Sequence, residues 1–159
     1  MQKAAVAMNP LKLLALDEAD LEVVSSHLQD AVVRVGDIAY LPSQKRFAAV
    51  LHRFDWETAI EPAAKHYRRR RAALRFDRVL GAQHKQLKPH AEDRVLSLLA
   101  IGFEADDPPG GRVTLTFSGG ASIQLKVECL EAELSDLGPA WRTHSKPEHP
   151  GDEPGGAGG

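Results

Sequence analysis

The sequence predicts an α+β domain that is mainly β, in which an antiparallel sheet of about six strands curls into a barrel or sandwich beside one N-terminal amphipathic helix. Three observations predict this class. Apolar residues recur at helical spacing only near the N-terminus, whereas further along the chain they alternate with polar residues. Such alternation is the period of a half-buried strand. Segments rich in Gly, Pro, Asp and Ser separate the alternating runs, as turns between strands would.

The segment DEADLEVVSSHLQDAV predicts the helix. Asp17 is a residue type that caps helix N-termini, because its side-chain oxygen can accept a hydrogen bond from a free backbone N–H of the first turn. Leu21, Val24 and Leu28 then recur at the spacing of one helix face. We therefore expect an amphipathic helix over about residues 18–30.

Past residue 30 the apolar period changes from that of a helix to that of a strand. The alternating residues predict two strands, over residues 32–41 and 46–54, joined by the turn PSQK. Gly36 and Asp37 interrupt the first strand and indicate a β-bulge. The two strands should therefore form a hairpin with a kink in its first strand.

The segment RRAALRFDRVL predicts a third strand with one buried face. Its even-numbered positions are apolar, namely Ala72, Leu74, Phe76 and Leu80. Its odd-numbered positions include Arg71, Arg75 and Asp77, which should face solvent. The strand is thus expected to lie across the core with its arginines outside.

The remaining strands complete the expected core. The run VLSLLAIGF, residues 95–103, is apolar on both faces, as a central strand would be. The segment GRVTLTFSGGASIQLKVECL predicts a hairpin about the turn SGGA. We expect one core made by Leu21, Val24, Leu28, Leu74, Phe76, Leu99, Ile101, Leu115, Phe117, Ile123 and Leu125.

Length and composition predict one globular domain over residues 11–143, between a flexible N-terminus at 1–10 and a disordered Pro/Gly-rich tail at 144–159. The 159 residues are 43% hydrophobic and 26% charged, which excludes a wholly disordered chain. We find no signal peptide, and the longest apolar run is far shorter than the ~20 residues of a transmembrane helix. Either Met1 or Met8 could be the start.

Cysteine and histidine content argues against redox and metal chemistry. Cys129 alone cannot form an internal disulfide, which favours a cytoplasmic protein. Its place in an alternating run predicts a small buried hydrophobe rather than a reactive thiol. The seven histidines show no metal-ligand spacing, and the sequence has no phosphate-cradling or dinucleotide-binding loop. The sequence therefore predicts no cofactor and no metal.

The run RRRR at residues 68–71 is the strongest candidate for a binding surface. Residues 65–88 hold nine Lys or Arg against one acidic residue, although the formal net charge of the chain is −2. Alternation should place Arg69, Arg71 and Arg75 outward, where an acidic protein or a phosphate-bearing ligand could bind them. The competing interpretation is that the acidic remainder of the chain pairs with these arginines.

A second candidate site is the segment HRFDWE, residues 52–57. In an extended strand Arg53, Asp55 and Glu57 would share one face. Paired carboxylates beside a histidine can perform acid–base chemistry where a pocket separates their pKa values. The competing interpretation is a strand end with solvated charges. No nucleophile motif accompanies these residues, so no catalytic residue is assigned.

Four longer segments together resemble a known family. They are LDEADLEVVSSHLQDAVVRVGDIAYLP, KRFAAVLHRFDWE, RRRRAALRFDRVL and VECLEAELSDLGPAW. In this order they are similar to an uncharacterised bacterial family, a domain of unknown function of about this length from mainly Gram-negative species. The likeness covers about residues 11–142. It implies no activity, and it transfers no catalytic residue.

These observations predict a non-enzymatic cytosolic binding or accessory module with a basic surface around residues 65–88. The alternative is a small enzyme that acts on an anionic metabolite, with Asp55 and Glu57 beside an arginine cluster. An unpaired strand edge could also form a homodimer. No motif identifies the partner or the ligand.

Overall fold

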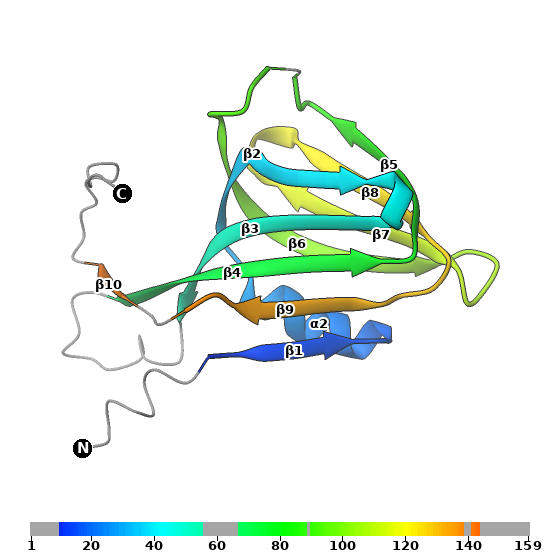
Figure 1. Cartoon of the computed structure of the whole chain (residues 1–159), viewed down its shortest axis with the longest axis horizontal. Coiled ribbons are helices and arrows are strands. Elements are labelled where there is room, and N and C mark those ends of the chain that lie inside the picture. Colours follow the sequence, from blue (N-terminus) through cyan, green and yellow to red (C-terminus); the bar gives the residue numbers. More distant parts are fainter. Residues whose placement is uncertain (1–9, 56–66, 89, 139–140, 144–159) are drawn as a thin grey trace.

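The computed structural model describes residues 10–55, 67–88, 90–138 and 141–143, and within them it contains ten strands and one α-helix (Figure 1). Their order is β1 (Lys12–Ala15), α2 (Glu18–His27), β2 (Val32–Leu41), β3 (Arg46–Asp55), β4 (Tyr67–Asp77), β5 (Val79–Lys85), β6 (Val95–Ala105), β7 (Gly111–Phe117), β8 (Ser122–Val127), β9 (Ala132–Asp136) and β10 (Trp141–Thr143). Two short 3-10 helices, η1 (Pro42–Gln44) and η2 (Ser118–Gly120), lie in turns. The prediction of a mainly β domain with one N-terminal helix is confirmed.

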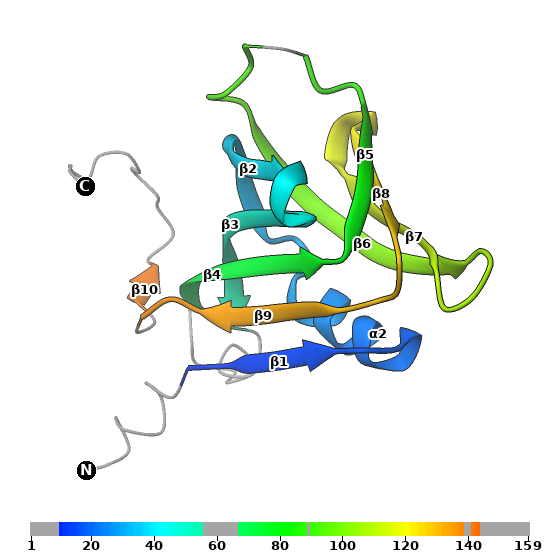
Figure 2. The ribbon, with the colours of Figure 1, turned by 45° about the vertical axis from the view of Figure 1, so that its right-hand side comes forward.

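All strand pairs are antiparallel, and the strands follow the order β1-β9-β4-β3-β2-β6-β7-β8-β5, with β10 added beside β4. The expectation of about six strands was too low. The sheet is also not closed into a barrel, because β1 and β5 form its two ends and do not pair with each other. It curls strongly around its interior (Figure 2).

Two bends produce this curl and account for part of the difference in strand number. The predicted third strand is divided at Arg78, whose φ of 63° is in the left-handed region, so that β4 ends before it and β5 begins after it. The chain also bends between β8 and β9. The two bent segments pair on both sides of their bends, β4 with β9 and β5 with β8, and so connect the two halves of the sheet.

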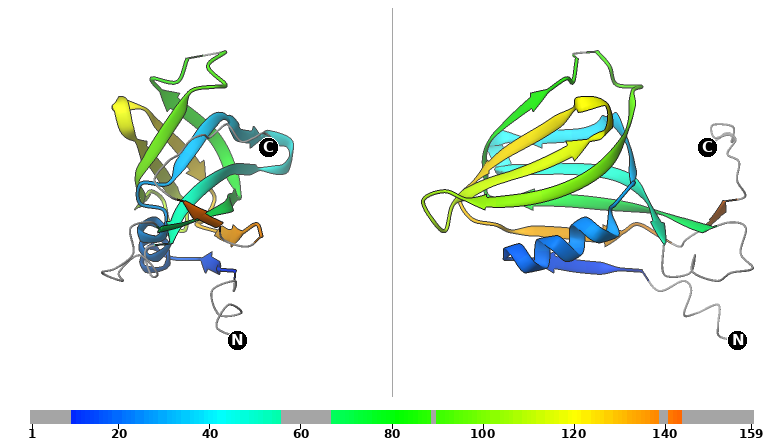
Figure 3. Two further views of the ribbon diagram at one scale, coloured as in Figure 1. Left: turned by 90° about the vertical axis from the view of Figure 1, so that its left-hand side faces the viewer. Right: turned by 180° about the vertical axis from the view of Figure 1, so that it is seen from behind.

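The helix α2 begins where the sequence predicted and ends earlier. The Asp17 carboxylate accepts a hydrogen bond from the backbone N–H of Asp20 at 2.8 Å, which is the expected N-cap. The helix ends at His27 rather than near residue 30, with Leu28 as its C-cap, and Asp30 beyond it takes a left-handed φ of 66°. Leu21 and Val24 are buried as α2 packs against β1 and β6 along one border of the curled sheet (Figure 3).

The core lies inside the curl, and ten of the eleven residues predicted for it are buried there. Its largest fully buried side chains include Leu21, Leu28, Phe47, Leu74, Phe76, Leu98, Leu115, Leu125 and Leu134. The prediction was wrong at Leu99, which is 46% exposed. A register shift between Leu98 and Ala100 breaks the alternation of β6, so Leu98 and Ile101 both face the core. An irregularity of the backbone also explains the exposure of Leu80. The bend at Arg78 shifts the alternation by one residue, so that Val79 points into the core and Leu80 points outward.

The hairpin of β2 and β3 was predicted to within one residue of its bounds, since β3 ends at Asp55 rather than at residue 54. Its register shifts between Val33 and Ile38, which confirms the bulge expected at Gly36 and Asp37. Before the bulge β2 pairs with both β3 and β6, whereas its last residues pair with β3 alone. The outer edge of this second half of β2 is therefore free, and so is the edge of β5 that does not pair with β8.

Two sequence predictions, on the two ends of the chain, remain untested. Residues 1–9 and 144–159 lie outside the described residues, so the flexible N-terminus and the disordered tail are still predictions. The described residues contain no helix that is long and apolar enough to cross a membrane.

Candidate functional site

The arginines at the start of β4 are divided between its two faces. Arg70 points into the curled sheet and is 3% exposed, whereas Arg69 is half-buried and Arg71 is exposed on the outer face. The side chain of Arg68 is outside the described part of the structure. Alternation along a strand explains this division, because successive side chains point to opposite faces.

The inward arginines converge on one carboxylate. Arg53 on β3 donates two hydrogen bonds to Asp136 on β9, from Nε to Oδ1 and from Nη2 to Oδ2, each at 2.9 Å. Arg70 Nη1 lies 3.7 Å from Oδ2, and the backbone N–H of Leu11 donates to that oxygen at 2.7 Å. The three charged side chains are almost completely buried. We call Arg53, Arg70 and Asp136 the buried charge cluster, and it joins three strands from inside.

The buried charge cluster weakens the alternative enzyme site. In that predicted site Arg53 shares a face with Asp55 and Glu57, but Arg53 is held inside the sheet by Asp136. The side chain of Asp55 and the whole of Glu57 lie outside the described residues, so their positions stay untested. The guanidinium of Arg53 is therefore engaged in structure and does not form an open anion site.

Arg75, the third residue of the predicted basic patch, is paired within the chain. Its Nε donates to Asp77 Oδ2 at 2.9 Å and its Nη2 donates to Glu133 Oε1 at 2.8 Å. Burial alone would raise the pKa of Asp77, but hydrogen bonds from Arg46 and Arg75 outweigh burial and lower it. The Ser135 hydroxyl is the largest cause that lowers the pKa of Glu133. For Arg75, the competing interpretation of self-pairing is the one the geometry supports.

Other basic residues of the 65–88 segment also separate. Arg78 lies 3.5 Å from Glu131 and 3.9 Å from Glu128 at the bend. Lys85 and Lys88 follow on β5 and beyond it, where the strand leaves the line of β4. The segment is therefore not one continuous basic surface, because the bend at Arg78 directs its two halves differently.

The remaining outward residues form what we call the basic corner, made by His52, Arg69 and Arg71. His52 and Arg71 are opposite each other in the β3–β4 register, and Phe54 is opposite Arg69. The Arg69 guanidinium lies over the Phe54 ring at 5.7 Å from its centroid. Its Nε is buried and has no hydrogen-bond partner in the described part of the chain. Burial lowers the pKa of Arg69.

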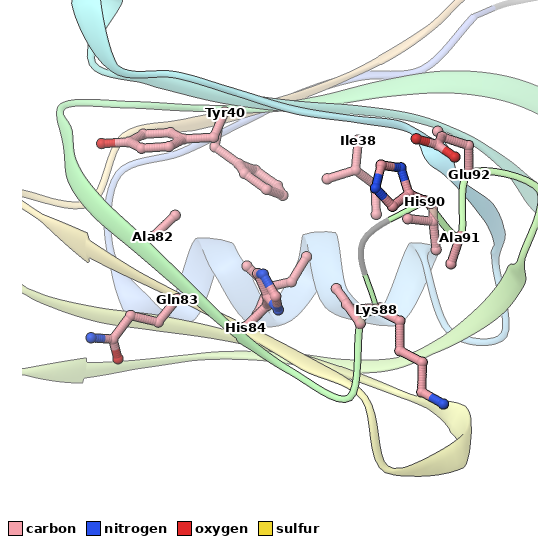
Figure 4. A pocket seen from close by; sticks show the side chains of 14 residues that line it. Ile38, Tyr40, Ala82, Gln83, His84, Lys88, His90, Ala91 and Glu92 are labelled. Carbon is pink, nitrogen blue, oxygen red and sulfur yellow. The ribbon is translucent and has the colours of Figure 1, made fainter.

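A pocket is the second candidate site, and it lies between the free edges of β2 and β5. Its volume is about 460 Å³, and Figure 4 shows Ile38 and Tyr40 on one side with Ala82 and His84 on the other. The strand that contains Ile38 and Tyr40 was predicted from the sequence, but the pocket was not. No local signal reveals one, because it exists only where two distant strands fail to pair.

The comparison with family models decides what the chain is related to. The model for a protein of unknown function, DUF2948, matches residues 11–149. The chain belongs to the DUF2948 family. This confirms the resemblance to a domain of unknown function, while the bacterial and Gram-negative origin stays a prediction. No curated protein and no solved structure shows significant similarity to the chain.

Membership of the DUF2948 family brings no activity and no site residues with it, so the site rests on geometry. Among the residues that the structure describes, no group of three or more His, Cys, Asp or Glu could hold a metal ion. Cys129 is a free, half-buried thiol. In the part of the DUF2948 domain that the structure describes, the basic corner and the pocket between β2 and β5 are two candidate sites.

The basic corner should make the stability of the DUF2948 domain depend on pH. Burial is the main cause that lowers the pKa of His52 below its usual 6.5, with Arg69 and Arg71 adding to it and Asp37 opposing it. Above that pH both the folded and unfolded chains hold a neutral imidazole. Below pH 6.5 the unfolded chain takes up a proton on this imidazole, whereas the folded chain does so only at lower pH. The free energy of unfolding therefore decreases as the pH is lowered.

We expect this fall between about pH 7 and pH 5 in urea unfolding, and a smaller fall in the His52→Gln variant. The carboxylates with lowered pKa values, Asp77 and Glu133, act mainly at lower pH and should affect both proteins equally. Parallel curves for the two proteins over this range would show that His52 is not the titrating group.

Proposed function

We propose that the domain is a non-enzymatic binding or accessory module of the cytoplasm and that the basic corner binds an anionic partner. The observation that carries this proposal is a difference among the arginines of β3 and β4. Arg46, Arg53 and Arg75 each donate to a carboxylate of the chain. Arg71 is exposed, and no ion pair involves it in the described part of the chain.

The chemistry of the corner suits phosphate or carboxylate groups. A guanidinium presents its donors in a planar fork that matches either group with two parallel hydrogen bonds. Arg69 is held against the Phe54 ring, which limits its rotamer freedom and reduces the entropy lost on binding. The nearby Arg34 is already paired with Asp37 and Asp93, at 3.6 and 3.5 Å. The local excess of positive charge is therefore supplied by Arg69 and Arg71.

The free thiol of Cys129 supports the cytoplasmic part of the proposal, since reducing compartments keep such thiols unpaired. The non-enzymatic part is supported by the engagement of Arg53 with Asp136, which removes Arg53 from the arginine cluster of the alternative enzyme. No observation favours that alternative over a binding surface.

Binding by the full chain can be measured with two fluorescent probes, a single-stranded oligonucleotide and a poly-glutamate peptide. We expect the Arg69→Gln, Arg71→Gln double variant to lose about tenfold or more in affinity for at least one probe. For the oligonucleotide, log K should fall with log salt by about 0.7 for each phosphate contacted. Arg75 is left unchanged, because it is already paired with Asp77 and Glu133 within the chain.

The matched control is the Lys85→Gln, Lys126→Gln double variant, which removes the same charge from exposed positions on β5 and β8. It should bind both probes nearly as the unchanged protein does. Equal losses of affinity in the two double variants would mean that only the net charge of the protein matters, and the basic corner would then not be a binding site. Preference for one probe would assign the partner as phosphate-bearing or as an acidic protein.

A further inference from the structure

The pocket between β2 and β5 is an opening in the sheet that is bounded by backbone contacts at both ends. At one end the backbone N–H of Val79 donates to the carbonyl of Lys45 at 2.9 Å, which brings the start of β5 against the β2–β3 turn. At the other end lie residues 86–88 and 90–94, between β5 and β2, and we call these two stretches the bridging segment. The two free edges thus meet at one end, separate, and are bridged again, which leaves a window onto the core.

The bridging segment is fixed in place by the bulge of β2. The backbone N–H groups of Val35 and Gly36 donate to the carbonyls of Arg94 and Glu92, each at 2.9 Å. A side chain at Gly36 would place its Cβ 3.1 Å from Glu92, so only glycine allows this close approach without adjustment. Arg94 Nη1 also donates to the Gln86 carbonyl at 2.6 Å, which ties the two ends of the segment together.

The floor and walls of the pocket are apolar. Phe47 and Ile123 form part of its floor and are 2% and 4% exposed, so the floor is the core itself. The half-buried walls pack against that core and are formed by Val35, Ile38, Tyr40, Ala82 and Leu87. The volume of about 460 Å³ lies within the usual range of sites for small organic ligands.

The rim carries a small set of charges. In the view of Figure 4, Tyr40 lies at one end of the pocket, and Lys88, His90 and Glu92 lie at the other. Lys88 is exposed, and no ion pair involves it in the residues that the structure describes. An anionic group of a ligand could therefore pair with Lys88, while the carboxylate of Glu92 would oppose a second negative charge.

We infer that this pocket binds a small organic monoanion, with an aliphatic or aromatic body on the apolar floor and one carboxylate at the rim beside Lys88. The apolar body supplies most of the affinity, because the floor and walls exclude water from it. The carboxylate sets the orientation. A dianion such as an alkyl phosphate is disfavoured by Glu92. This site is on a different strand pair from the basic corner and does not depend on it.

The test uses the full chain with hexanoate, octanoate and decanoate, with octanol and octyl phosphate as comparison ligands. In calorimetric titrations the Kd should fall by about fourfold for each added methylene until the pocket is full. Octanoate should bind more tightly than octyl phosphate. In NMR spectra the largest amide shifts should fall on Ile38, Tyr40 and Ala82.

Two variants and a matched control locate the site. Lys88→Gln should weaken the binding of octanoate by about two- to fivefold, because an exposed ion pair contributes little more than this. The affinity for octanol should not change. Lys85→Gln is the control, since Lys85 is exposed nearby but does not line the pocket. Ala82→Trp should fill the pocket and abolish binding of all the ligands. If the Ala82→Trp variant fails to fold, the comparison of Lys88→Gln with Lys85→Gln still tests whether the ligand binds in the pocket.

Three results would overturn the inference: affinity that does not change with chain length, equal effects of the two lysine changes, or amide shifts confined to other strands. The pocket could instead be covered by a second copy of the chain. In that case light scattering would show a dimer that Ala82→Trp converts to a monomer, and the carboxylates would not bind.

Discussion

Replacing Asp136 with alanine is expected to lower the free energy of unfolding by about 3 to 5 kcal/mol, because it leaves buried arginines without their carboxylate. The Asp136 side chain is 0% exposed, and it accepts hydrogen bonds from Arg53 and from the backbone of Leu11. Its Oδ2 also lies 3.7 Å from Arg70 Nη1. Without it the two guanidiniums would face each other in a region of low dielectric.

The matched control for this change is Asp106→Ala. Asp106 is also paired with an arginine, Arg112 Nη1 at 3.0 Å, but its side chain is 61% exposed. An exposed pair contributes at most about 1 kcal/mol, so this variant should unfold almost as the unchanged protein does. Urea unfolding of both variants measures the difference. Equal losses at the two positions would mean that Asp136 is not holding the interior together.

Replacing Phe76 with alanine is the second change expected to have a large effect, at about 3 to 5 kcal/mol of unfolding free energy. The Phe76 side chain is 0% exposed and contacts the Phe47 ring, with centroids 6.3 Å apart at 56°. It lies next to the bend that joins the two halves of the sheet. The cavity left by its removal would therefore open at the point where both halves pack together.

Leu99→Ala is the informative comparison for Phe76. The sequence pattern placed Leu99 in the core, but the side chain is 46% exposed. Its truncation should cost only about 0.5 kcal/mol, as is usual for surface positions. Thermal or urea unfolding of the two variants gives the ranking. A Leu99 variant that is as unstable as the Phe76 variant would favour the regular alternation of the sequence prediction over the bulge.

Local patterns were sufficient for much of the fold. The bounds of β2 and β3 and the N-cap at Asp17 were predictable because each depends on neighbours within a few residues. The end of α2 and the burial of Leu99 were not. At the β6 bulge the backbone of Leu98 bonds with Asp30 and Ala31, more than sixty positions away along the chain by residue number. No pattern within β6 contains that partner.

The candidate site shows the same division between local and distant causes. Alternation correctly separates Arg69 and Arg71 from Arg70 by face, since it depends only on the strand period. It does not reveal that Arg75 would find Glu133, or that Arg53 would find Asp136. Both carboxylates come from β9, a short strand near the end of the described domain that the sequence analysis did not predict.

The apolar face and the charged face of most strands can be read from the order of the amino acids, because side-chain direction follows from the backbone period. Which of those charges are neutralised, and where the sheet stays open, depends on how distant segments come together. Ion pairing depends on distances of a few ångströms between residues far apart in the chain, and the Coulomb energy falls with that distance and with exposure to water. The pocket likewise arises from the path of the two bends, which leaves β2 and β5 unpaired with each other.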